Sequence, residues 1–265
     1  MSTPEPTAAR PVAAESGHWY TITGETAYTM AKKDGTGDRP TTLRDARKLN
    51  LLPSVTTILK VLHKQALVQW LIEQAVLVAV TAPRFPGEEL DAFIRRVLKD
   101  EKQQDVEAQK ARDLGTDIHA AIEQAVTGRP WDISLAVHVN PVLEALKQFG
   151  EIRFAEKIII GEGYAGKTDY IAENDKAITV VDFKTAKTVP EKEPWDEHKL
   201  QLAAYAAGLG NTGSKDIRTV NIYISTTQPG LIKVLESQQW TQTFINGFAP
   251  LVKYWQWQSG YTPMQ

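Results

Sequence analysis

The spacing of apolar residues changes near residue 154. Before that point apolar side chains recur every three or four positions, which is typical of helices. After it they alternate with polar residues or run continuously, as in strands. The sequence therefore predicts an α/β protein, in which a helical first half precedes a mixed sheet with elements in the order α-β-β-β-α-β-β-α.

Capping and helix-breaking residues give the limits of these elements. Ser54 is a good N-cap for a helical region that Pro83 and Pro86 end. We expect further helices at 41–50, 88–127, 140–153, 195–208 and 239–258, strands at 154–160, 164–172, 177–184, 217–225 and 231–236, and a hairpin at 18–30 that turns at Gly24-Glu25. The expected regions are a disordered tail at 1–17, an N-terminal hairpin and loop at 18–52, a helical region at 53–130 and a core at 131–265, to which the helix around His119 also belongs.

Composition places the chain among ordinary globular proteins. Of its 265 residues 42% are hydrophobic and 23% are charged, and no run approaches the roughly 18 apolar residues of a membrane span. The N-terminal segment is rich in Pro, Ala and Ser and lacks the features of a signal peptide. The absence of Cys excludes disulfides, thiolate zinc sites and iron–sulfur clusters. A net charge of −2 argues against a passive nucleic-acid coat but permits an enzyme that grips a few nucleotides.

Two aspartates occupy strand positions in the run GYAGKTDYIAENDKAITVVDFK. Asp is depleted in strands, so Asp169 and Asp182 need a physical reason. Along the second strand, Asp182 and Lys184 share one face. A loop of two or four residues centred on Asn174-Asp175 would set Asp169 opposite Val180, and it would bring both carboxylates to that face, on a diagonal roughly 7–8 Å apart at Cα.

These charges have two interpretations. An Asp-x-Lys on a solvated strand commonly forms only a weak cross-strand ion pair. Residues 178–181, however, form a nearly continuous apolar run, which is typical of a strand buried on both faces. Because buried charges need partners or a metal, the sequence favours two carboxylates that share a divalent cation such as Mg²⁺.

Two further pairs lie four residues apart on predicted helices, so each pair shares a helix face. Gly115 precedes His119, and a lone His beside an apolar stripe is more often a hydrogen-bonded core residue than a ligand. A glycine in mid-helix destabilises the helix by about 0.5–1 kcal/mol relative to Ala. A close approach by another group would explain why glycine stands at this position. Gln201 and Tyr205 form the second pair and, taken alone, are expected to bond each other or the backbone.

Two assignments depend on local geometry. Glu156 lies opposite Asp169 and joins the site if Glu162-Gly163 is a two-residue turn, but it faces away if the loop has three residues. Three hydroxyl residues stand at a predicted helix N-terminus, where they either cap the helix or contribute to a phosphate site. They are Ser54, Thr56 and Thr57.

Together these motifs resemble the PD-(D/E)XK nuclease superfamily, in its RecB-like and lambda-exonuclease-like branch. The family pattern is G-x-x-x-H, G-x-x-D, D-x-K and Q-x-x-x-Y. The chain supplies it in order as Gly115…His119, Gly166…Asp169, Asp182…Lys184 and Gln201…Tyr205. Each motif is weak alone, but four in order on suitable elements are specific. The segment LLPSVTTILKVL is also similar to phage-type exonucleases and to the mitochondrial genome maintenance exonuclease.

The resemblance implies a restriction-endonuclease-like core, αβββαββα, that hydrolyses phosphodiester bonds with a divalent metal. It assigns metal binding to Asp169, Asp182, the backbone carbonyl of Phe183 and His119. Lys184 would hold and polarise the attacking water, since its ammonium group is compact and has rotatable donors. The lack of Cys distinguishes the chain from relatives that carry an iron–sulfur cluster.

Other residues have supporting roles in this interpretation. Glu156 matches the upstream acid of the family, while Gln201 and Tyr205 would steady the site or the DNA backbone. The helical region is expected to arch over the site and to guide a single strand. The candidate nucleic-acid contacts are Ser54, Thr56, Thr57, Lys60, Trp70 and Lys187.

The expected function is that of a Mg²⁺- or Mn²⁺-dependent deoxyribonuclease. It would be an exonuclease that acts on single-stranded DNA ends in phage or bacterial replication, recombination or repair, in the cytoplasm of a bacterium or a phage-infected host. A single-strand annealing or binding protein is an expected partner, and no membrane is. An endonuclease for structured or duplex DNA stays open, because one fold hosts both activities. A non-catalytic recombination subunit is disfavoured, because Asp169, Asp182 and Lys184 are all intact.

Overall fold

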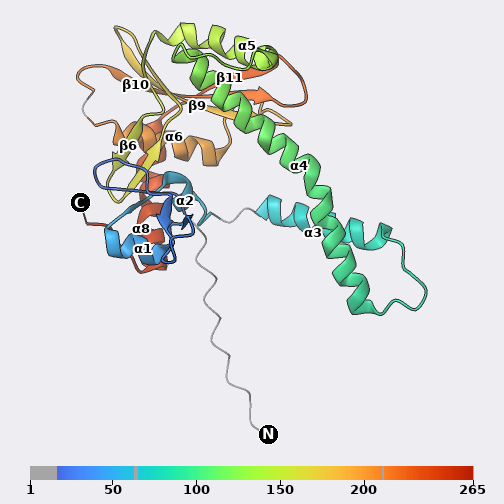
Figure 1. Ribbon diagram of the computed structural model, residues 1–265. Helices are drawn as coiled ribbons and strands as arrows, with labels where there is room; N and C mark the ends of the chain where they lie inside the picture. Colours follow the sequence, from blue (N-terminus) through green and yellow to red (C-terminus); the bar gives the residue numbers. More distant parts are fainter. Residues whose placement is uncertain (1–16, 63–64, 211, 265) are drawn as a thin grey trace.

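The computed structural model describes residues 17–62, 65–210 and 212–264 (Figure 1). At its centre lies a five-stranded sheet in the order β11-β10-β9-β8-β5. Only β9 and β10 are parallel neighbours; the other pairs in this sheet are antiparallel. The strands are β5 (Glu151–Ala155), β8 (Tyr170–Glu173), β9 (Ala177–Ala186), β10 (Asp216–Ser225) and β11 (Ile232–Ser237).

Helices cover both faces of this sheet (Figure 1). Phe183 and Val181 of β9 pack on one face, in a core shared with α4 (Leu90–Val126) and α5 (Ala136–Leu146). On the other face Val180 packs in the core that includes α6 (Asp196–Gly208). The predicted α/β class is confirmed, and β9 is buried on both sides, as its continuous apolar run indicates.

A second group of elements packs against α6. It contains α1 (Leu43–Leu49), α2 (Val55–Leu59), α7 (Trp240–Thr243), a π-helical turn (Phe244–Phe248) and α8 (Ala249–Ser259). Their shared core includes Trp19, Tyr164 and Trp255. Ser54 caps α2 as predicted, since its Oγ accepts a hydrogen bond from the backbone N–H of Thr57 at 2.9 Å.

The helical segments between residues 65 and 126 form an arm. Helix α3 (Gln65–Thr81) and the first part of α4 project away from the sheet (Figure 1). Among the described side chains of the arm, several large apolar groups are exposed: Ile72, Val76, Leu77, Val80, Phe85, Leu90 and Ile94. No helix in the described ranges has the length and apolar character of a membrane span. The predicted tail at 1–17 lies outside those ranges except for Gly17.

The predicted hairpin at 18–30 forms over a short stretch, where Tyr20 and Thr26 make an antiparallel bridge and the N–H of Ala27 donates to the carbonyl of Trp19 at 2.8 Å, but its longer strand pairs are made elsewhere. A turn does form at Gly24, whose N–H donates to the carbonyl of Thr21 at 3.1 Å. However, β1 (Trp19–Tyr20) pairs with β4 (Leu52–Pro53), while β2 (Thr29–Ala31) pairs with β3 (Asp38–Pro40). The side chain of Trp19 is buried in the core, and this long-range burial, which local turn signals do not reveal, selects the partner strand.

Two strands predicted as continuous are interrupted near the carboxylates. The one expected at 154–160 breaks at Glu156, which has a left-handed φ of +52°, and the one expected at 164–172 breaks after Lys167. Between the breaks, β6 (Ile158–Gly161) and β7 (Tyr164–Lys167) form a separate hairpin. The N–H of Glu156 donates to the carbonyl of Asp169 at 3.0 Å, so the two bends lie side by side.

The helix predicted at 140–153 is also shorter than expected. It begins earlier, as α5, and ends at Leu146. Gly150 then adopts a φ of +107°, a conformation that favours glycine, and the following residues form β5.

Candidate active site

Asp169 and Asp182 face each other where β8 separates from β9. The register pairs Tyr170 with Val181, so Asp169, which precedes β8, stands opposite Asp182. The Oδ2 atom of Asp169 accepts a hydrogen bond from the N–H of Phe183 at 2.8 Å. The side chain thus occupies the place where a continuing strand would pair, and this leaves its carboxylate at an open edge of the sheet.

The predicted face is confirmed, but the predicted register is wrong by two residues. Val180 pairs with Ile171 instead of with Asp169. Between the last paired residues, Glu173 and Ile178, the chain turns with the Oδ1 of Asn174 accepting the N–H groups of both Lys176 and Ala177 at 2.9 Å. A two-residue shift preserves the side of the sheet to which each side chain points, so the carboxylates still converge.

Asp182 is almost completely buried and has two partners. Its Oδ2 lies 2.7 Å from Nζ of Lys184 and accepts a hydrogen bond from Nδ2 of Asn221 at 3.0 Å. Both partners approach the same oxygen, and Oδ1 is left for another ligand. Asn221 is the register partner of Asp182 in β10 and is fully buried. Its own Oδ1 has no hydrogen-bond partner in the described structure.

The motifs of the sequence do not single out Asn221. A signal was present, since an Asn in the middle of the apolar run TVNIYI is as unusual as the two aspartates in their strands. Its contact with Asp182 depends on the parallel pairing of β9 with β10, which sequence spacing alone does not give.

Burial and like charge raise the pKa of Asp169 to about 7. Desolvation is the main cause and the charge of Asp182 is the second, opposed by Lys184 and by the hydrogen bond from Phe183. The side chain nevertheless keeps 23% of its surface exposed, so a ligand can reach it. When both carboxylates are ionised, they hold one more negative charge than Lys184 neutralises.

Lys184 remains an ammonium ion in this site. Burial by itself lowers its pKa, but the charges of Asp182 and Asp169 outweigh burial and raise it. A lysine that keeps its proton can donate hydrogen bonds to water or phosphate, but it does not accept a proton.

His119 approaches the carboxylates from α4. Its Nδ1 lies 3.8 Å from Oδ2 of Asp169, and its ring meets the ring of Phe183 edge-on. Burial lowers the pKa of His119 to about 4, so the imidazole is neutral at neutral pH and has a free lone pair. The predicted close approach at Gly115 is confirmed, because a Cβ there would lie 2.5 Å from Oγ1 of Thr185 in β9.

Gln201 and Tyr205 are buried on α6, and the Nε2 of Gln201 donates to the Tyr205 hydroxyl at 2.9 Å, as expected. Desolvation, with a smaller contribution from Asp182, raises the pKa of Tyr205 well above its usual value. Gly166 makes room for this ring, since a Cβ there would lie 2.5 Å from Cε1 of Tyr205. The pair therefore forms a rigid wall beside the carboxylates.

Glu156 lies beside the site but is engaged elsewhere. The two-residue turn at Glu162-Gly163 is present, because Gly161 pairs with Tyr164, and the backbone of Glu156 meets that of Asp169 as predicted. Its carboxylate, however, forms an ion pair with Lys167.

The candidate nucleic-acid contacts divide into two groups. Ser54 and Thr56 line a cavity of about 280 Å³ that Lys167, Gln201 and Tyr205 also line. The hydroxyl of Ser54 forms hydrogen bonds with those of Thr56 and Thr57, at 2.9 and 2.8 Å. Of the others, Lys60 and Lys187 are exposed, while the side chain of Trp70 lies outside the described residues.

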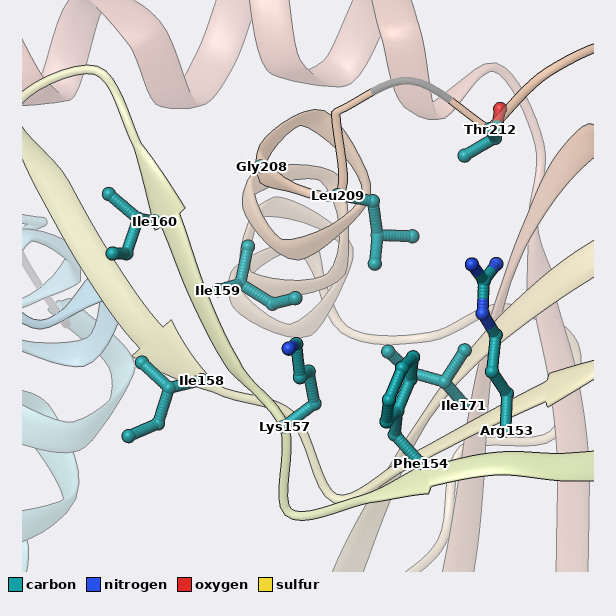
Figure 2. Close-up of a pocket in the computed structure, with 10 residues that line it drawn as sticks. All are labelled: Arg153, Phe154, Lys157, Ile158, Ile159, Ile160, Ile171, Gly208, Leu209 and Thr212. Atoms are coloured by element: carbon teal, nitrogen blue, oxygen red, sulfur yellow. The ribbon is translucent and has the colours of Figure 1, made fainter. Parts of the chain in front are cut away.

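Another cavity of about 300 Å³ lies at the C-terminal end of α6 and is lined by none of the predicted site residues. Figure 2 shows Phe154 between the side chains of Lys157 and Arg153, with Ile159 and Leu209 opposite. Both cations lie over the Phe154 ring: Nζ of Lys157 is 4.8 Å and Cζ of Arg153 is 5.5 Å from the ring centroid. Because no carboxylate is among the residues that line this cavity, we do not assign hydrolytic chemistry to the cavity.

The donors around Asp169 suit a hard divalent cation. Two carboxylates and a neutral imidazole offer oxygen and nitrogen ligands, and one ammonium ion leaves a net negative charge. Over the described part of the chain, no group of three or more His, Cys, Asp or Glu side chains is arranged so that it could hold a metal ion. Mg²⁺ does not need such a group, because it commonly binds through one or two carboxylates and retains waters or takes phosphate oxygens.

Comparison with known proteins gives a family for part of the chain. Residues 142–253 match the family model of the PD-(D/E)XK nuclease superfamily. This segment contains the aspartates, Lys184, Asn221, Gln201 and Tyr205, but not His119. No curated protein matches the chain.

Among solved structures, "Crystal structure of SSO0001" is similar over 44% of this chain and 54% of that chain, with 19% sequence identity and a TM-score of 0.28. The chain thus spans about half the length of that protein, and a likeness this low carries no argument about function.

Proposed function

We propose that this protein is a Mg²⁺- or Mn²⁺-dependent deoxyribonuclease that degrades single-stranded DNA from its ends. The premise is that residues 142–253 carry a domain of the PD-(D/E)XK nuclease superfamily. The observation that carries the proposal is the opposition of Asp169 and Asp182 beside Lys184 at an open sheet edge. The family implies a nuclease. The metal, the DNA ends and a role in phage or bacterial DNA processing are our inferences.

In the proposed mechanism Asp169 and Asp182 would hold the cation, and His119 would contribute directly or through water. When bound, the cation stabilises negative charge on the phosphate and lowers the pKa of water. Asn221 and Lys184 both engage Oδ2 of Asp182, so that its Oδ1 would be the oxygen left to hold the cation. Asp169, whose raised pKa favours the proton, would be held in its ionised form when the cation is bound.

Lys184 has a separate part in the proposed reaction. Because it stays protonated, it orients the attacking water and balances charge on the phosphate by donating hydrogen bonds. The wall of Gln201 and Tyr205 excludes solvent from one side, which strengthens these interactions.

The cavity beside Tyr205 supports an end-dependent activity. It is lined by the hydroxyls of Ser54 and Thr56, by Lys167 and by His18. Burial lowers the pKa of His18, and the positive charges of Lys60 and Lys167 lower it further, while Lys167 is itself paired with Glu156. A cavity of about 280 Å³ next to the site is suited to a terminal nucleotide, whereas an endonuclease needs a path for the strand on both sides.

A time course on end-labelled linear and circular DNA, single- and double-stranded, tests this proposal. We expect linear single strands to be degraded with Mg²⁺ or Mn²⁺, circles to resist, and EDTA to stop the reaction until the metal is restored. Rapid cutting of circles would favour the endonuclease alternative. Cleavage that persists in excess EDTA would exclude the metal-dependent mechanism.

A further inference from the structure

An exposed tryptophan stands at the end of α6 nearest to Lys184. Trp195 immediately precedes the helix, and 46% of its surface is exposed. Its ring nevertheless has fixed neighbours, since its centroid lies 5.3 Å from those of both Tyr223 and His198. Its backbone N–H donates to the Tyr223 hydroxyl at 3.1 Å, and Nδ1 of His198 lies 2.7 Å from the same oxygen. The aromatic cluster Trp195–His198–Tyr223 therefore presents an ordered ring to solvent.

The register of the sheet places this cluster beside the candidate active site. Tyr223 is paired with Lys184 across the parallel strands, as Asn221 is paired with Asp182. Residues two apart on a strand share a face, so Tyr223 follows Asn221 on the side of the carboxylates. Tyr223 is itself fully buried and serves as the anchor. The ring of Tyr223 thus lies between the Trp195 indole and the ammonium group of Lys184.

The chain places the aromatic cluster and the cavity beside Tyr205 at opposite ends of the site. Trp195 and Tyr205 are ten positions apart along the helical path of α6, or roughly 15 Å at the helical rise. A strand whose terminal nucleotide occupies the cavity would run past the carboxylates and Lys184 before it reaches the indole.

The charges around the Trp195 indole indicate which part of a nucleotide the indole can bind. The first turn of α6 is acidic, with Asp196 and Glu197, and Lys199 is paired with Glu193 at 2.7 Å and with Asp196 at 3.3 Å. Such a surface repels a phosphate but accepts the neutral face of a base. Stacking on an aromatic ring is tolerant of base identity, as an enzyme that degrades a strand progressively requires.

We infer that Trp195 is a base-stacking subsite for a single-stranded nucleic acid. Its indole binds the nucleobase that lies on the opposite side of the scissile phosphate from the Tyr205 cavity. This inference rests on the proposed function, because it takes the strand to be the substrate of the same site. Trp195 is a binding residue here and has no part in the proton transfers.

An abasic scan tests the subsite. Single-stranded oligonucleotides, each lacking one base at a successive position from the end, would be measured for binding in Ca²⁺ and for cleavage in Mg²⁺. For the unmodified protein we expect one or two positions where loss of the base weakens binding about 5- to 100-fold. In Trp195→Ala that sensitivity should vanish at those positions alone, while Trp195→Phe should retain most of it.

Trp257→Ala is the matched control, because Trp257 is 77% exposed on α8, outside the aromatic cluster. It should reproduce the profile of the unmodified protein. A Trp195→Ala protein that melts normally and keeps the same abasic profile would overturn the subsite, and so would failure of the unmodified protein to bind any of the oligonucleotides. Base-dependent binding through Trp195 without cleavage would uphold the subsite while refuting the nuclease proposal, so the two failures are distinguishable.

Discussion

Replacing Asp182 by Asn or Lys184 by Ala is expected to lower the rate of DNA cleavage by about 10²–10⁴-fold or more. Asp182→Asn removes a charged ligand while keeping the shape of the side chain and its ability to accept from Asn221. Lys184→Ala removes the only ammonium group that contacts Asp182 in the described structure. The measurement is single-turnover cleavage of an end-labelled single strand in saturating Mg²⁺.

Matched surface variants separate this effect from a general loss of structure. Asp34 is exposed in a loop, and the side chain of Lys147 is 71% exposed with Glu144 as its partner. Asp34→Asn and Lys147→Ala should cleave at the rate of the unmodified protein. Thermal melts in Mg²⁺ should show that all four variants are folded, and oligonucleotide binding should persist. Cleavage at an unchanged rate in both site variants would refute the mechanism.

Asp169→Asn is expected to stabilise the metal-free protein above neutral pH while abolishing its response to Mg²⁺. The pKa of Asp169 is raised to about 7 in the folded protein, against an ordinary value of 3.8. The folded state therefore binds a proton more tightly than the unfolded state does. As pH rises from about 4 through 7, Asp169 ionises and the free energy of unfolding falls. The loss is complete above that range.

A shift of this size corresponds to about 4 kcal/mol at most, and solvent at the open edge reduces it to about 1–3 kcal/mol. Urea unfolding in EDTA at pH 5 and pH 8 would measure the difference between Asp169→Asn and the unmodified protein. We expect the variant to be more stable at pH 8 and the gap to shrink at pH 5. Asp34→Asn serves again as the control. Mg²⁺ should raise the melting temperature of the unmodified protein and of Asp34→Asn but not that of Asp169→Asn; an equal rise in Asp169→Asn would place the cation elsewhere.

Local patterns were sufficient to predict the face on which the carboxylates meet. Alternation along β9 puts Asp182 and Lys184 on one side, and any loop of even length brings Asp169 to the same side. The energetic cost of Gly115 in a helix likewise indicated a close approach, which the contact with Thr185 explains.

Features that depend on distant partners could not be predicted in this way. The break after Lys167 lies in a sequence that continues to read as a strand, and it arises because the β6–β7 hairpin turns away to pair separately. The role of Asn221 depends on β10 lying parallel to β9, with α6 between them in the chain. Trp19 is similar: its strand partner follows from burial in a core that elements far apart in the sequence build together.

Crystals grown with Mn²⁺ would show directly whether these side chains hold a metal. An anomalous difference map should contain a peak in contact with carboxylate oxygens of both Asp169 and Asp182, and Asp182→Asn crystals should lose it. A map with no peak between the two carboxylates, from protein that degrades DNA in the same Mn²⁺ buffer, would contradict the proposed site.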